Sequence, residues 1–202
     1  MGSKEKLKEY KQKRDFSKTA EPSPGKKKSK GEPVFVIQKH KASSLHYDFR
    51  LELEGVLASW AVPKGLSTDP SQKRLAVRTE DHPLDYADFE GVIPEGEYGA
   101  GTVIVWDTGT YKNIRKEKKN DGLSMEESLD DGKIEVWLKG KKIKGSYVLI
   151  ETGRKKNQWL LKKMKDNEAD ARRNPVSTEP KSVLSGKSIE EMAEAVKQQS
   201  EE

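Results

Sequence analysis

Hydrophobic and polar residues alternate along several short stretches in the middle of this 202-residue chain. Side chains of a β-strand point alternately to its two faces, so a period of two predicts strands. Turn signals such as Glu54-Gly55 and Asp131-Gly132 separate several of these stretches. The predicted strands cover residues 34–39, 45–54, 56–62, 73–79, 101–106, 133–139, 143–151 and 157–163. Many short strands at regular spacing predict a mainly β fold, an antiparallel barrel or sandwich of about eight strands.

The segments that flank these strands are polar and give weaker predictions. Residues 4–14 are compatible with a helix but have almost no apolar stripe, and residues 19–33 are rich in proline, glycine and lysine. We therefore predict a flexible basic N-terminal arm and linker over residues 1–33, and a β domain over residues 34–164. The arm carries the lysine run at residues 26–28.

One or two short helices are also expected. Residues 123–130 predict a helix that begins after Ser124, whose hydroxyl can accept from the first-turn amides. The polar tail, residues 165–202, is predicted to be disordered up to residue 187. A terminal helix is expected over residues 188–198, because Ile189, Met192 and Val196 would then share one face.

Composition and charge narrow the class of protein. Apolar residues make up 32% and charged residues 36%, so the core must be confined to the middle of the chain. The absence of cysteine excludes disulfides, thiolate metal ligands and a cysteine nucleophile. No apolar stretch approaches the roughly 20 residues that span a bilayer, so we expect a cytoplasmic protein without membrane contact. Residues 1–40 hold 12 Lys and Arg against 5 Asp and Glu, which suits either nucleic-acid binding or a merely solubilising arm.

The three histidines fall in two compact clusters, and one cluster indicates metal chemistry. His46, Asp48 and Arg50 would share one face of a strand, and a tight turn after His40 can fold that residue back over it. Imidazole and carboxylate suit a divalent metal such as manganese, zinc or iron, and a guanidinium suits phosphate oxygens. The alternative, polar groups on a solvated strand face, has about equal weight from spacing alone.

Several motifs together resemble the 3′-phosphoesterase domain of bacterial and archaeal DNA ligase D, over roughly residues 10 to 163. They are His40-Lys-Ala-Ser-Ser-Leu-His46-Tyr-Asp48-Phe-Arg50, Ser59-Trp60-Ala-Val-Pro63-Lys64-Gly65, Glu80-Asp81-His82-Pro83-Leu-Asp-Tyr86 and Ile93-Pro-Glu-Gly-Glu-Tyr98-Gly-Ala-Gly. Their number and their order along the chain make the resemblance specific.

The resemblance implies a β-barrel with a central polar cavity and a divalent metal, manganese by preference, with cobalt or zinc as other choices. It implies removal of a 3′-terminal ribonucleoside from DNA and then of the remaining 3′-phosphate, which leaves a 3′-hydroxyl for repair or ligation. By motif, the metal ligands would be His40, His46 and Asp48. The catalytic residues around the phosphate would be Arg50, His82 and Tyr86.

Three candidates for substrate binding follow from position: Gln38 shares strand parity with His40, and Lys64 and Arg74 lie where they could reach the cavity rim. The resemblance in the leading segment implies that Arg14, Asp15 and Glu21 support substrate binding or orientation. For Lys64 and Arg74 a place at the cavity rim and a plain surface role have equal weight. The match around residues 14–21 implies that the arm folds over the site. The aromatic residues at 60, 98, 106 and 137 are expected in the core.

The chain has no room for a ligase or polymerase module, so we expect a stand-alone, monomeric enzyme or one that works with a separately encoded DNA ligase. Its expected partners are DNA 3′ ends, including primer–templates with a 3′-ribonucleotide or 3′-phosphate, in association with the nucleoid. Two alternatives remain open. The main alternative to the two-step enzyme is a non-catalytic nucleic-acid-binding barrel with a structural metal, and a third possibility is an enzyme with only one of the two activities.

Overall fold

The structure is a computed structural model that describes residues 3–25, 31–153, 155 and 157–201. All eight strands predicted from alternation are present in it. The elements are α1 (Ser3–Lys6), α2 (Lys8–Gln12), β1 (Val34–Lys41), β2 (Leu45–Leu53), β3 (Val56–Val62), β4 (Lys73–Arg78), β5 (His82–Pro83), the 3₁₀-helix η1 (Leu84–Asp88), β6 (Gly91–Ile93), β7 (Gly101–Asn113), α3 (Ile114–Glu117), α4 (Met125–Asp130), β8 (Lys133–Gly140), β9 (Lys144–Glu151), β10 (Gln158–Lys163), α5 (Pro175–Thr178) and α6 (Ile189–Glu201).

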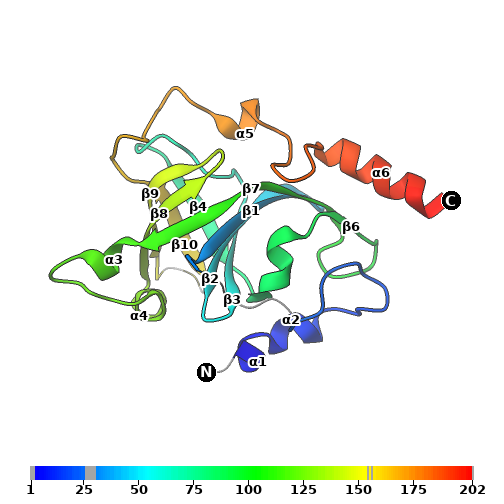
Figure 1. Ribbon diagram of the computed structural model, residues 1–202, viewed down its shortest axis with the longest axis horizontal. Helices are drawn as coiled ribbons and strands as arrows, with labels where there is room; N and C mark the ends of the chain where they lie inside the picture. Colours follow the sequence, from blue (N-terminus) through cyan, green and yellow to red (C-terminus); the bar gives the residue numbers. More distant parts are fainter. Residues whose placement is uncertain (1–2, 26–30, 154, 156, 202) are drawn as a thin grey trace.

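The eight predicted strands close into an antiparallel barrel (Figure 1). Their order is β1-β2-β3-β4-β10-β9-β8-β7, and β7 also pairs with β1, which closes the ring. The short strands β5 and β6 lie outside this ring and pair with β3 and β7. Helix α4 also follows the prediction, since Ser124 and Glu127 form a reciprocal capping box at its start.

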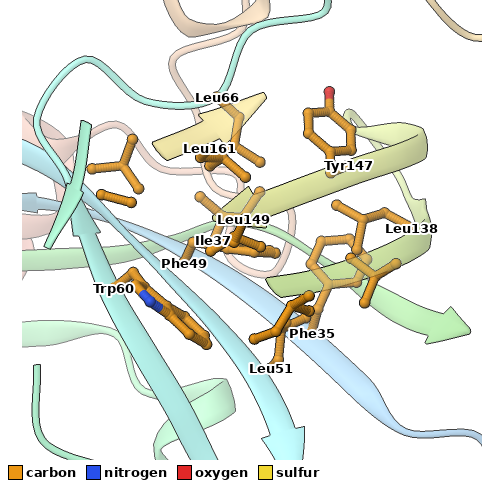
Figure 2. Packing of buried hydrophobic residues seen from close by; sticks show 14 of the residues in the cluster. Phe35, Ile37, Phe49, Leu51, Trp60, Leu66, Leu138, Tyr147, Leu149 and Leu161 are labelled. Carbon is orange, nitrogen blue, oxygen red and sulfur yellow. The ribbon is translucent and has the colours of Figure 1, made fainter. Parts of the chain in front are cut away.

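The interior of the barrel is filled by apolar side chains (Figure 2). Phe35, Tyr47, Phe49, Trp60 and Leu149 all belong to this core and are at most 2% exposed. The expected polar cavity lies outside this core rather than at the centre of the barrel. Alternation explains this, because the inward-facing residues of β2 are aromatic and aliphatic, which directs its polar residues to the outer face.

The outer face of β1, β2 and β3 is covered by a second layer. Segments from η1, β6 and the N-terminal arm pack there, and their apolar side chains form a separate cluster with residues of these strands. Leu7, Tyr10, Val36, Leu57 and Tyr86 are buried in this cluster. The polar residues of β2 are therefore enclosed between the barrel wall and this covering layer, and the polar cavity lies there.

The N-terminal arm packs against the barrel, and the prediction of a flexible arm is wrong for residues 3–25. Tyr10 is fully buried, Leu7 is buried beside it, and the Tyr10 hydroxyl donates to the Pro22 carbonyl oxygen at 2.8 Å. Two well-placed apolar residues are enough to dock the arm, although they form no recognisable stripe in sequence. The lysine run at 26–28 lies outside the described residues.

The C-terminal tail also has defined contacts, so the prediction of disorder up to residue 187 is wrong. The Trp106 indole donates to the Glu179 carbonyl oxygen at 2.7 Å, and the Thr68 hydroxyl is 2.8 Å from the carbonyl oxygens of Asp170 and Arg173. Backbone carbonyls of the tail make these contacts, which side-chain patterns do not reveal. The predicted terminal helix is confirmed as α6.

Helix α6 packs against β7 through the predicted face. Ile189 and Met192 are buried against Ile104, with Val196 packed beside them. Among the described residues, no helix is long and apolar enough to cross a membrane.

Candidate functional site

The β1–β2 hairpin brings three candidate metal ligands together. His40 and His46 are direct cross-strand partners, and Asp48 lies two residues further along β2 on the same face. Gly101 permits the close approach of β7 to this hairpin, because a Cβ there would lie 2.2 Å from the Lys41 carbonyl oxygen. The predicted folding-back of His40 over the strand is therefore confirmed.

Hydrogen bonds to the backbone orient both imidazole rings. His40 Nε2 lies 2.9 Å from the Gly99 carbonyl oxygen, and His46 Nδ1 lies 3.0 Å from the Ser44 carbonyl oxygen. A carbonyl oxygen only accepts, so each of these nitrogens carries the ring proton. The other ring nitrogens, His40 Nδ1 and His46 Nε2, are turned toward Asp48, and such backbone support is typical of metal-binding histidines.

The Asp48 carboxylate lies between these two free nitrogens. One oxygen is 3.6 Å from His40 Nδ1 and the other is 3.7 Å from His46 Nε2. Ligand atoms sharing one ion at about 2.1 Å are at most about 4.2 Å apart, so these separations fit. All three ligand atoms lie within 4.8 Å of one another, so closing on one ion needs only small side-chain movements.

Electrostatics keep Asp48 ionised. Burial alone would raise its pKa, but the Arg50 guanidinium and the nearby His40 and His46 outweigh burial and lower the pKa to about 2. Two imidazole nitrogens and one carboxylate oxygen form a ligand set suited to manganese, iron, cobalt or zinc. The residues therefore fit a divalent metal, although its identity does not follow from the ligand set.

Arg50 is held rigidly beside this cluster. Its Nη2 is 3.3 Å from Asp48, its Nε donates to the Gln38 amide oxygen at 2.7 Å, and its Nη1 donates to the Ser59 hydroxyl at 2.9 Å. Gln38 is fully buried, and its amide nitrogen donates to the carbonyl oxygens of Tyr86 and Phe89, each at 3.0 Å. In this structure Gln38 positions Arg50 and η1.

His82 is enclosed between two arginines. Its Nδ1 is 2.9 Å from the Glu80 carbonyl oxygen and 3.0 Å from Arg50 Nη1, and its Nε2 is 3.2 Å from Arg14 Nη2. Because an arginine donor faces each ring nitrogen, a positive charge on the imidazole is disfavoured. Burial, then the charges of Arg50 and Arg14, hold the pKa of His82 well below 6.5. His82 is therefore a neutral acceptor here.

The arm supplies the other side of the site. Arg14 donates to Glu21 at 2.8 Å and to Glu80 at 3.1 Å, and Tyr86 donates its hydroxyl to Glu21 at 2.9 Å. Burial, with Glu21 as the next cause, raises the pKa of Tyr86 well above 10. Tyr86 is therefore a neutral donor, and the arm folds over the site as the match around residues 14–21 implied.

These side chains line a cavity of about 280 Å³. Eight of the predicted site residues line it: Arg14, Glu21, His40, His46, Asp48, Arg50, His82 and Tyr86. Gln38 lies behind Arg50 and is not among the lining residues.

Three other predicted substrate-binding residues lie away from the cavity, so their role stays a prediction. Lys64 is exposed in the turn after β3. Asp15 accepts from the backbone amide and the hydroxyl of Ser17. Arg74 shares a face of β4 with the core residue Ala76.

Sequence reasoning missed several lining residues, and two of them carry polar side chains that contact the arm, Glu80 and Tyr98. Glu80 is only 7% exposed and forms ion pairs with Arg14 and Lys13. It directly precedes the Asp81-His82 motif, which is the signal that could have identified it. Tyr98 was expected in the core but is 47% exposed at the cavity, whereas Trp60 and Trp106 are fully buried as expected.

The fold and the site define a β-barrel protein that carries a candidate divalent-metal centre next to an arginine- and histidine-lined pocket for an anion. Residues 38–151 match the family model described as the DNA ligase D 3′-phosphoesterase domain. The chain belongs to this family.

Curated relatives agree with this assignment. The chain is 50% identical over 195 residues to the multifunctional non-homologous end joining protein LigD of Pseudomonas aeruginosa, covering 94% of this chain and 22% of that protein. It is 49% identical over 163 residues to LigD of Mycobacterium tuberculosis and 46% identical over 168 residues to LigD of Mycolicibacterium smegmatis. Those two matches cover 80% of this chain, and 20% and 21% of the relatives. The chain thus spans about a fifth of the length of these relatives.

Proposed function

We propose that this chain is a metal-dependent phosphoesterase that processes DNA 3′ ends in non-homologous end joining. The observation that carries the proposal is the His40–His46–Asp48 cluster, with both rings already oriented, next to Arg50 and His82 in one cavity. The relatives are named as multifunctional end-joining proteins, and their match to this chain supports the same pathway.

In the first step, water attacks the phosphorus of the last phosphodiester, and the bond from phosphorus to the 5′ oxygen of a 3′-terminal ribonucleoside breaks. The nucleoside leaves and a 3′-phosphate remains. In the second step, water hydrolyses that monoester to inorganic phosphate and a 3′-hydroxyl. His40, His46 and Asp48 would hold the metal, with manganese preferred and cobalt or zinc as substitutes. A divalent ion bound there would withdraw charge from a phosphate oxygen and make water more acidic.

The remaining side chains bind and orient the phosphate. Arg50 has its guanidinium fixed by Gln38 and Ser59, so it presents fixed donors to non-bridging oxygens at little conformational cost. Arg14 forms the opposite wall of the cavity, and Tyr86 supplies a neutral hydroxyl. His82 contacts both Arg14 and Arg50 in the free protein, and an anion that neutralises these guanidinium groups would make protonation of His82 easier.

The location of the cluster favours catalysis over a purely structural metal. The apolar barrel core lies on the inner face of β2, and the three ligands lie on its outer face, so the core does not require an ion to form. A structural metal, as in a non-catalytic nucleic-acid-binding barrel, would be expected to hold the fold together.

The expected substrates are primer–templates that end in one ribonucleotide or in a 3′-phosphate. We further propose that the protein acts as a monomer in the cytoplasm, near the nucleoid, and hands its 3′-hydroxyl product to a DNA ligase. Lys64, Arg74 and Asp15 stay candidates for contacts with the DNA outside the cavity.

An end-processing assay tests the proposal. Wild type, His46→Ala and His82→Ala are incubated with a labelled primer ending in one ribonucleotide, with and without manganese. We expect manganese-dependent conversion to a 3′-phosphate and then to a 3′-hydroxyl in the wild type, and loss of both products in the variants. Full activity of His46→Ala would overturn the proposal, and a wild type that makes only one of the two products would restrict it to one activity.

A further inference from the structure

Tyr98 differs from the other aromatic residues around the cavity. Tyr10, Tyr86 and Phe89 are at most 9% exposed, whereas Tyr98 is 47% exposed and lines the cavity. Tyr98 also borders a second, polar pocket on the outer side of the arm, so its ring stands at the rim between the cavity and the surface. An aromatic ring at such a rim is accessible to a ligand that enters the cavity.

Two cations of the N-terminal arm hold the ring of Tyr98 in place. Lys13 Nζ lies 4.6 Å from the ring centroid and donates to the Tyr98 hydroxyl at 3.3 Å, and the Arg14 guanidinium carbon lies 5.4 Å from the centroid. Cations at these distances are attracted to the face of an aromatic ring. The ring is therefore oriented before any ligand binds, although about half of its surface is open.

The same loop connects Tyr98 to the metal cluster. Gly99, the next residue, accepts the hydrogen bond from His40 Nε2 at 2.9 Å. The ring therefore stands one residue away from a backbone group in contact with a candidate metal ligand. A phosphate bound at the cluster would place the nucleoside attached to it within reach of this rim.

We propose that Tyr98 is the stacking platform for the base of the 3′-terminal nucleotide whose phosphate occupies the cavity. This inference rests on the proposed function and adds a substrate-binding residue to it. Stacking on an aromatic ring is tolerant of base identity, because every base presents a π face. Tyr98 then favours ends that carry a nucleoside beyond the phosphate and contributes nothing to the hydrolysis of a bare 3′-phosphate.

The test compares two primer ends: a ribonucleotide with its base, and an abasic ribonucleotide that keeps the ribose and its 2′-hydroxyl. Kinetics are measured with manganese for wild type, Tyr98→Ala and Tyr98→Phe, which keeps the ring. Leu75→Ala is the matched control, because Leu75 is 42% exposed on β4 and does not line the cavity. Manganese affinity is measured for each variant by calorimetry.

Loss of a stacked base raises KM about 5- to 150-fold. We expect this rise for Tyr98→Ala on the base-bearing end, with kcat and manganese affinity nearly unchanged, and no rise on the abasic end. Tyr98→Phe and Leu75→Ala should behave as wild type. An equal loss on both ends, or no loss on either, would overturn the stacking role while leaving the proposed function intact. Failure of the wild type to release the nucleoside from the first end and ribose from the abasic end would refute the proposed function itself.

Discussion

Replacing Gln38 with leucine tests whether this residue positions the site or binds substrate. Leucine has a similar volume but no hydrogen-bonding groups, so Gln38→Leu removes three hydrogen bonds without opening a large cavity. It leaves the Arg50 Nε donor and the Phe89 carbonyl oxygen without this partner, whereas the Tyr86 carbonyl oxygen keeps the Phe89 amide at 3.1 Å. Gln38 is 0% exposed, so water does not readily replace the amide.

Each buried group that loses its partner costs about 1–3 kcal/mol of unfolding free energy. With two such groups, we expect Gln38→Leu to lower that free energy by about 2–6 kcal/mol. Domains of this kind are stable by about 5–15 kcal/mol, so enough stability remains to study the variant. Because Arg50 also loses its orientation, turnover should fall together with stability.

Urea unfolding followed by circular dichroism measures the change, with Gln158→Leu as the control. Gln158 is half-buried on β10 and does not line the cavity, so its replacement should change the free energy of unfolding by less than about 0.5 kcal/mol. A loss below about 1 kcal/mol for Gln38→Leu, accompanied by a raised KM, would refute the positioning role and restore the substrate-binding interpretation.

Three further outcomes are expected. The pKa of His82 in the folded state is below 6.5, so the unfolded chain takes up the proton first as the pH falls. The free energy of unfolding should therefore be full above pH 6.5 and fall by up to about 1.4 kcal/mol per pH unit below it. In urea unfolding from pH 8 to 5, the free energy of unfolding should decline less steeply for His82→Gln than for the wild type. Gly99 has a φ of 78°, so Gly99→Ala should displace the carbonyl oxygen that orients His40. Manganese binding, measured by calorimetry, should then weaken about 10- to 100-fold. The control is Gly96→Ala, at φ 87° with open space around it, which should leave the affinity for manganese unchanged. Removal of metal with a chelator should leave a folded, cooperatively unfolding barrel by circular dichroism, and loss of the native spectrum would contradict the separation of core and metal cluster.

The barrel strands and the metal cluster follow from short-range patterns in the sequence. Alternation identifies each strand, and a three-residue connection between β1 and β2 requires His40 and His46 to face each other. These features depend on residues close in sequence, so a single chain is enough to predict them.

Long-range packing accounts for what the sequence did not reveal. The burial of Tyr10 depends on a surface built from η1 and β3, which no pattern in the arm predicts. The tail docks through backbone carbonyls, which every residue has. The polar face of β2 can point into the barrel or out of it, depending on which face the other strands bury. The sequence of β2 alone does not show this, which is why the cavity was expected at the centre of the barrel. Tyr98 was assigned to the core because an aromatic residue in a loop carries no sign of its exposure.

The two halves of the site differ in how far apart their residues lie along the chain. The three candidate metal ligands lie between residues 40 and 48 in one hairpin, whereas Arg14 and Glu21 reach the cavity only when the arm is docked. A molecule whose arm has opened while its barrel stays closed keeps all three candidate ligands and loses one wall of the cavity. Under the proposed function, metal loading and readiness for a DNA end would therefore be separate events, and the free energy of this local opening would set the fraction of loaded molecules that are ready.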